Sequence, residues 1–198
     1  MIKDHLAVMQ DLKLYASPKA RLTRMLKSGS LIQVRRGLFV DNPQESCKVL
    51  ASVIYGPSYL SFQYALSFHG LIPERVPVYM SASFGKNKDK HYSTPLGEFS
   101  YFYLPQAVYP YGIQRLEEDD LPFLIASPEK ALCDAVYKVP GISGIQEIGP
   151  LLTENWRMEK DDLARLDQGL IAWLAPLYHR RSVAALAAWF AEDWSECP

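Results

Sequence analysis

Basic side chains are concentrated at the start of this sequence. Residues 1–40 hold eight lysines and arginines against two aspartates, a net charge of +6, whereas the rest of the chain sums to −7. Clustered cations can neutralise the phosphates of a polyanion such as nucleic acid. The distribution therefore predicts a basic module that meets a polyanion, joined to a body that does not. A solvated basic surface explains the charge alone equally well.

Many of these cations lie in a segment with a helical pattern. Ser17 is a natural N-cap, Pro18 suits the first helical position, and Gly29 suits the residue after the helix. An apolar stripe of Leu22, Met25 and Leu26 predicts a buried face, because helical residues advance about 100° each. On or beside the opposite, exposed face we expect Lys19, Ala20, Arg21, Thr23, Arg24 and Lys27.

This arrangement is what a helix in the major groove of DNA requires. Cations neutralise phosphates, while one or two side chains reach the base edges. An arginine such as Arg24 can donate two hydrogen bonds to guanine O6 and N7, and the methyl group of Thr23 can contact thymine. We therefore expect this helix to bind DNA, although surface helices with lysine and arginine also occur without any nucleic-acid partner.

Two short predicted strands follow, at residues 31–34 and 38–40, joined across Arg35, Arg36 and Gly37. Arginines at a hairpin tip suit a narrow minor groove or its flanking phosphates. Together with a helix predicted over residues 5–15, the order of helix, basic helix and basic-tipped hairpin is typical of a winged helix-turn-helix. The first of that fold's usual three helices is hard to find here.

The remaining sequence predicts a mixed fold. Expected helices cover residues 44–55, residues 62–69 behind the N-cap Ser61, a segment that begins at Ser127, and a tail from Glu154 that breaks at Pro176. Expected strands cover residues 76–84, 99–104, 113–116 and 123–126. The predicted fold class is α+β. We expect residues 1–42 to form a winged-helix-like module, and residues 43–198 to form an α/β domain with a small sheet and C-terminal helices.

Little in the sequence points to catalysis or to a metal. The four histidines are scattered, the three cysteines lack a C-x-x-C pair, and no phosphate-binding glycine loop or G-x-S-x-G elbow occurs. The acidic run at 117–120 is typical of a solvated loop, and Lys130 is expected to pair with Asp134 one helical turn on. We expect a binding protein rather than an enzyme, with no catalytic residue, cofactor or metal.

The sequence also predicts the compartment. The longest purely apolar run, residues 183–191, is far shorter than the roughly 20 residues of a membrane helix. The first residues carry an acid and no apolar block, unlike a secretory signal. We therefore expect a cytoplasmic protein with no membrane partner.

Four blocks of the sequence, in this order and spacing, carry a family likeness: residues 29–40, 55–74, 94–101 and 126–134. They resemble the AbiEi-type antitoxins of abortive-infection toxin–antitoxin systems. The chain departs from the family's pattern at Phe62, Gln63 and Tyr64, where a small or acidic residue is expected. The likeness covers about residues 17–137 of this chain.

The resemblance implies a function. An N-terminal winged helix-turn-helix represses the operon by binding repeats in its own promoter, and the following α/β domain counters a nucleotidyltransferase-like toxin encoded next door. In many members neutralisation needs no stable complex with the toxin. The alternative is a protein-interaction module that sequesters the toxin or another partner, with little DNA binding.

A second basic cluster falls in residues 85–91, which are predicted to form a hairpin loop. Its candidate residues are Lys86, Lys88, Lys90 and His91. They are expected either to make a second polyanion contact, to belong to the surface used against the toxin, or to keep a loop tip soluble.

Overall fold

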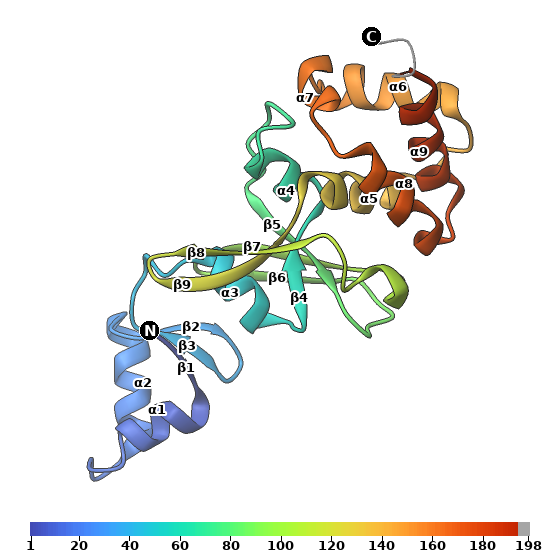
Figure 1. Ribbon diagram of the computed structural model, residues 1–198. Coiled ribbons are helices and arrows are strands. Elements are labelled where there is room, and N and C mark those ends of the chain that lie inside the picture. Colours follow the sequence, from blue (N-terminus) through green and yellow to red (C-terminus); the bar gives the residue numbers. More distant parts are fainter. Residues whose placement is uncertain (194–198) are drawn as a thin grey trace.

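The computed structural model describes residues 1–193, and they form three parts that follow one another along an elongated molecule (Figure 1). A small N-terminal module lies at one end, a central sheet with helices on both of its faces lies in the middle, and the C-terminal helices lie at the other end. The fold is mixed α+β, as the sequence predicts.

The N-terminal module pairs strands that are distant in sequence. Its sheet has the order β1-β3-β2, with both pairs antiparallel, and its two helices lie between β1 and β2 in the chain. The elements are β1 (Ile2–Asp4), α1 (His5–Asp11), α2 (Pro18–Ser28), β2 (Ile32–Arg35) and β3 (Leu38–Val40). The carboxylate of Asp4 caps α1 by accepting a hydrogen bond from the Ala7 amide at 2.7 Å.

The sheet of this module is covered on both faces. Phe39 packs with Val8, Leu12 and Leu31 into a small cluster that also holds the apolar stripe of α2. Its neighbours Leu38 and Val40 point the other way, because side chains alternate along a strand, and they join the main hydrophobic core of the molecule. Apolar packing therefore continues across the predicted domain boundary at residue 42.

The central sheet has six strands in the order β6-β7-β5-β4-β9-β8. It is a mixed sheet, since β4 runs parallel to β9 and β5 parallel to β7, while the other neighbours are antiparallel. The strands are β4 (Ser58–Leu60), β5 (Val78–Ser83), β6 (Lys90–Thr94), β7 (Gly97–Tyr103), β8 (Ile113–Glu118) and β9 (Leu121–Ala126).

Helices pack on both faces of this sheet. Tyr101 of β7 points towards α3 (Cys47–Ile54), where its hydroxyl donates to the carbonyl of Ala51 at 2.6 Å. The next residue, Phe102, points to the opposite face and packs edge-on against Phe62 of α4 (Phe62–Phe68). On that same face lies the ammonium of Lys138, the last residue of α5 (Pro128–Lys138).

The C-terminal part is helical, and its helices α8 and α9 pack against α5. After the short 3₁₀-helix η1 (Gln106–Val108), which precedes β8, the remaining elements are η2 (Ile145–Glu147), α6 (Ile148–Pro150), η3 (Leu151–Asn155), α7 (Lys160–Ala164), α8 (Gln168–Leu174), η4 (Ala175–Tyr178) and α9 (Arg181–Asp193). Within residues 1–193, no helix is both long and apolar enough to cross a membrane.

Several predicted boundaries are wrong. The first helix ends at Asp11 rather than at residue 15, and Leu14 is 90% exposed. The next helix of the body begins at Cys47, behind the N-cap Ser46, rather than at residue 44. Three strands of three to five residues, β1, β4 and β6, were not predicted, because no alternating pattern was recognised in them.

The predicted hairpin loop over residues 85–91 is also wrong. Strand β7 lies between β5 and β6, so the residues after β5 cross over to a strand that is not its neighbour. Lys90 and His91 belong to β6, which pairs with β7. Only Lys86 and Lys88 lie in the connection.

The acidic run at 117–120 is not a simple loop. Glu117 and Glu118 end strand β8, while Asp119 and Asp120 form the tight turn into β9 with φ of 51° and 61°. Aspartate tolerates this left-handed region better than most residues. Glu118 is only partly exposed and binds residues of α3, as described below.

Candidate nucleic-acid interface and ligand pocket

Helix α2 presents the predicted basic face to solvent. Lys19, Arg21, Arg24 and Lys27 are all exposed, and none of them has a carboxylate within 4.0 Å among the described residues. Opposite them, the apolar stripe predicted from the sequence packs against the cluster around Phe39. The helix therefore carries four unpaired positive charges on a fixed support.

The local geometry of α2 follows its sequence with two differences. Ser17 is the N-cap residue and Gly29 adopts φ of 72° after the helix, but the Ser17 side chain makes no capping hydrogen bond. Ala20 is half-buried and so contributes little to the exposed face. The Thr23 hydroxyl donates to the Lys19 carbonyl at 3.0 Å, which occupies its only donor.

The β2–β3 hairpin carries the other two predicted cations. Arg35 ends β2 and Arg36 lies in the two-residue turn, where Gly37 adopts φ of 81°. Both arginines are exposed, and neither has an ion-pair partner in residues 1–193. By contrast, Lys3 is neutralised within the module, since its ammonium lies 2.8 Å from the Asp11 carboxylate.

A shallow hollow of about 240 Å³ lies where α2 begins. Tyr15, Ser17, Arg21 and Arg24 contribute to its wall, and the Arg21 guanidinium lies 5.1 Å from the centre of the Tyr15 ring. Two of the four helix cations thus converge on one concave surface.

The second predicted cluster is divided by the fold. The Lys86 ammonium lies over the Tyr55 ring at 5.1 Å, whereas Lys88 and Lys90 are exposed. His91 lies between Glu98, at 2.7 Å, and Ser100, at 3.0 Å, on the neighbouring strand. Since Lys90 and His91 are successive residues of β6, their side chains point to opposite faces. The four residues therefore do not form one surface.

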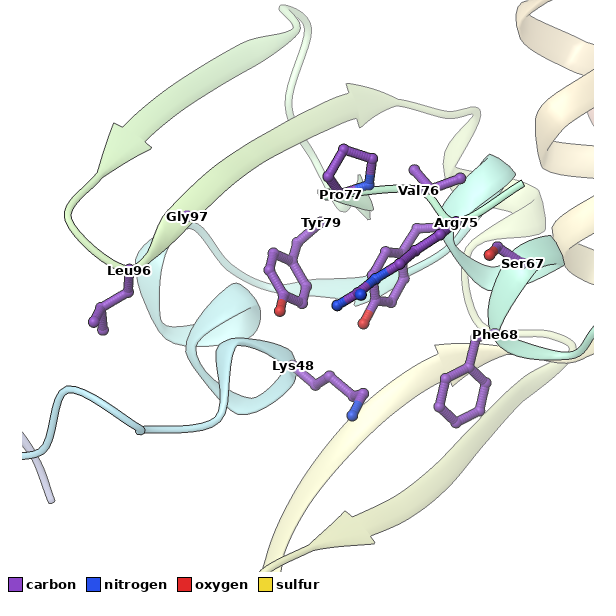
Figure 2. Close-up of a pocket in the computed structure, with 10 residues that line it drawn as sticks. Lys48, Ser67, Phe68, Arg75, Val76, Pro77, Tyr79, Leu96 and Gly97 are labelled. Carbon is purple, nitrogen blue, oxygen red and sulfur yellow. The ribbon is translucent and has the colours of Figure 1, made fainter. Parts of the chain in front are cut away.

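A larger pocket, which sequence reasoning missed, lies in the central part (Figure 2). It has a volume of about 450 Å³, within the range of small-molecule sites. Its walls come from α3, α4, the segment before β5, and the turn into β7. The lining residues are Lys48, Tyr64, Ser67, Phe68, Arg75, Val76, Pro77, Tyr79, Leu96 and Gly97.

One wall of this pocket is aromatic. The ring centres of Tyr64 and Tyr79 lie 5.0 Å apart at an angle of 40°, and Tyr79 stacks on its cross-strand partner Phe99 at 5.2 Å and 22°. Burial, followed by the nearby thiol of Cys47, raises the pKa of Tyr79 to about 12. Burial also raises the pKa of Tyr64. Both phenols therefore keep their protons at neutral pH and can donate hydrogen bonds.

Two cations, Lys48 and Arg75, line the pocket together with the hydroxyl groups of Ser67 and of the two tyrosines. Lys48 forms an ion pair with Glu118 of β8, and the Ser46 hydroxyl donates to the same carboxylate. Burial alone raises the pKa of Glu118, but these two hydrogen bonds outweigh it, so the net shift is downward. Arg75 is exposed and has no carboxylate partner among the described residues.

These residues gave no signal in the sequence. Lys48, Tyr64, Arg75 and Tyr79 lie on four different segments, with no motif that joins them. Each of them separately has the pattern of an ordinary surface or half-buried residue. Only the packing of α3 and α4 against the sheet brings them together.

The Lys130–Asp134 pair predicted from the sequence is present, with the ammonium 2.8 Å from the carboxylate. Both side chains are fully buried, and two distant tyrosines complete the cluster. Tyr178 binds both charged groups, and Tyr59 donates to Asp134 at 3.0 Å. Ser61 also donates to Asp134, at 2.6 Å. These groups hold α5, β4 and η4 together. None of them lines the pocket described above.

Residues 1–193 contain no group of three or more histidine, cysteine, aspartate or glutamate side chains placed to hold a metal ion. Burial raises the pKa of Cys47 and of Cys133, so neither thiol is an activated nucleophile.

No family model matches the chain, and a search of curated proteins finds no match.

Proposed function

We propose that this protein binds double-stranded DNA through residues 1–42 and acts as an antitoxin and autorepressor of the AbiEi type. The observation that carries the DNA-binding part is the set of unpaired, exposed cations on α2 and on the β2–β3 turn. Cations without carboxylate partners are free to replace the counterions of DNA.

The topology of the module supports this assignment. The order strand, helix, helix, strand, strand, with the first strand paired to the last, is compatible with a winged helix-turn-helix counted from its first strand. In that fold, the second helix of the turn enters the major groove. Here that helix is α2, whose apolar side is fixed by the cluster around Phe39.

The proposed mechanism needs no cofactor. Lys19, Arg21 and Lys27 neutralise phosphates beside the groove, and Arg24 donates to guanine. Arg35 and Arg36 contact the minor groove or its phosphates. Five to six phosphate contacts correspond to a slope of log affinity against log salt of roughly −4.5 to −5.5.

The test is fluorescence anisotropy with DNA from the gene's own upstream region and with scrambled DNA, across a salt series. Reversal of both charges in Arg24→Glu/Lys27→Glu is expected to abolish selective binding, because it places two anions against the phosphates. Lys160→Glu, on the exposed surface of α7, is the matched control and is expected to bind normally. Unchanged binding by the double variant would exclude α2 as the DNA-binding helix.

The antitoxin part of the proposal rests on the family resemblance. Its partner is the nucleotidyltransferase-like protein expected from the neighbouring gene. Co-expression of the two proteins is expected to restore growth that the neighbour alone arrests. Continued arrest, with the chain expressed and folded, would contradict this part and leave the DNA-binding part standing.

A specific observation favours the second candidate function, a protein-interaction module. Trp173 is 52% exposed and packs edge-on against the exposed Tyr111 at 4.7 Å. Phe84 is also exposed and lines an apolar hollow of about 540 Å³ together with Tyr109. Exposed aromatic groups are enriched in protein interfaces. Co-elution with the neighbouring gene product in gel filtration, lost in Trp173→Ala, would support this candidate.

A further inference from the structure

We propose that the pocket between α3 and α4 binds a small molecule that carries a planar ring and a phosphate group, the chemistry of a mononucleotide. This site lies in the body of the protein and shares no residue with the proposed DNA interface. It therefore goes beyond the function proposed above.

The planar ring is inferred from the shape and chemistry of one wall. Tyr64, Tyr79 and Phe68 contribute ring surface, and Val76, Pro77 and Leu96 add apolar surface. The Tyr79 ring stacks on the fully buried Phe99 of the neighbouring strand β7, so this part of the wall is already ordered before a ligand binds. A flat ring can stack on such a wall, as bases stack on aromatic side chains elsewhere.

The phosphate is inferred from the positive charge that lines the same pocket. Figure 2 shows the guanidinium of Arg75, the hydroxyl of Tyr79 and the ammonium of Lys48 directed towards the same space. Lys48 is already neutralised by Glu118, whereas Arg75 has no anionic partner within residues 1–193. A guanidinium offers paired donors that match phosphate oxygens, and the protonated phenols supply further donors.

The volume agrees with both groups bound together. A space of about 450 Å³ is larger than an inorganic anion needs and falls at the lower end of small-molecule sites. Arg75 and the aromatic residues both line this space, so a single ligand can contact both.

The experiment is calorimetric titration of the full chain, without DNA, with AMP and UMP. Ribose 5-phosphate and adenosine serve as the two half-ligands. At least one of the two nucleotides is expected to bind with a 1:1 stoichiometry. Each half-ligand is expected to bind about tenfold or more weakly than the better nucleotide, because each lacks one of the two interactions.

Two variants locate the binding. Arg75→Gln is expected to weaken binding of the nucleotide about tenfold or more through loss of a charge-assisted bond, with little effect on adenosine, which carries no phosphate. Arg165→Gln, at the exposed C-cap residue of α7, is the matched control and is expected to leave nucleotide binding unchanged. Circular dichroism of both variants confirms that the fold is intact.

Three outcomes would overturn the proposal. These are no binding of either nucleotide, binding that Arg75→Gln leaves unchanged, and ribose 5-phosphate or adenosine binding as tightly as the nucleotide. Each is independent of the DNA titration, since Arg75 lies outside residues 1–42.

Discussion

Lys130 and Asp134 are the residues whose environment departs most from an ordinary surface pair. Both are fully buried, Tyr178 hydrogen-bonds to both of them, and Tyr59 donates to Asp134. Asp134→Ala removes the only carboxylate within 4.0 Å of the buried Lys130 ammonium in residues 1–193. We expect a loss of about 3–5 kcal/mol in the free energy of unfolding, because an uncompensated buried charge is costly. Urea unfolding followed by circular dichroism measures it.

The matched control replaces both charges at once. Lys130→Met/Asp134→Leu leaves no unpaired charge, so its loss is expected to be clearly smaller than that of Asp134→Ala. If the two variants lose the same free energy of unfolding, the loss comes from the changed packing around Tyr178 and not from an unpaired buried charge.

The same cluster shows what can be predicted for single residues. The Lys130–Asp134 pair was predictable because residues four apart in a helix always lie together. Tyr59 and Tyr178 were not, since they come from segments 75 and 44 residues away from Asp134. Arg75 and Tyr79 of the pocket were missed for this reason as well. Such contacts depend on tertiary packing, which no local spacing records.

At the scale of elements, the contact between α3 and β8 is a pH-sensitive link. The hydrogen bonds of Lys48 and Ser46 keep the pKa of Glu118 below its unfolded value, against the opposing effect of burial. A carboxylate with a lowered folded-state pKa stabilises the protein above the unfolded pKa, near 4.5, and this contribution is lost as the pH falls through the folded value.

We therefore expect Glu118→Gln to lower the free energy of unfolding at pH 7, with the difference from the parent chain shrinking as the pH falls below about 4. Denaturant titrations at pH 7, 5 and 3.5 measure this difference. Glu117→Gln is the matched control, because the neighbouring side chain pairs with Arg115 on the other face of β8. A difference for Glu118→Gln that is equal at all pH values would contradict the link.

The helices and strands that could be predicted are those whose own residues show a clear sequence pattern. The alternating aromatics of β7, the cap, proline and apolar stripe of α2, and the cap and proline of α5 identified these elements from the sequence. Strands β1, β4 and β6 are short and are defined by their partners rather than by a pattern of their own. The crossover after β5 could not be predicted either, because the sequence of a loop does not determine where in the sheet the next strand lies.

At the scale of the whole molecule, β3 joins two bodies of packing. Leu38 belongs to the main core, whereas its neighbour Phe39 belongs to the separate cluster under α1 and α2. The tryptophans described by the structure all lie in the C-terminal part, Trp156 directly after η3, Trp173 in α8 and Trp189 in α9. Their fluorescence therefore reports on the body, at the opposite end of the molecule from α2.

These positions allow neighbouring substitutions to be compared. Leu38→Ala is expected to cost about 2–5 kcal/mol and to lower the denaturant midpoint seen by tryptophan fluorescence, because it opens a cavity in the shared core. Phe39→Ala is expected to shift that midpoint much less, since α1 and α2 can open locally while the body stays folded. Instead, it should raise the exchange of α2 amides with deuterium and weaken DNA binding, because the loosened helix no longer holds its cations in place. Equal midpoint shifts in the two variants would show that the N-terminal helices and the body unfold as one unit.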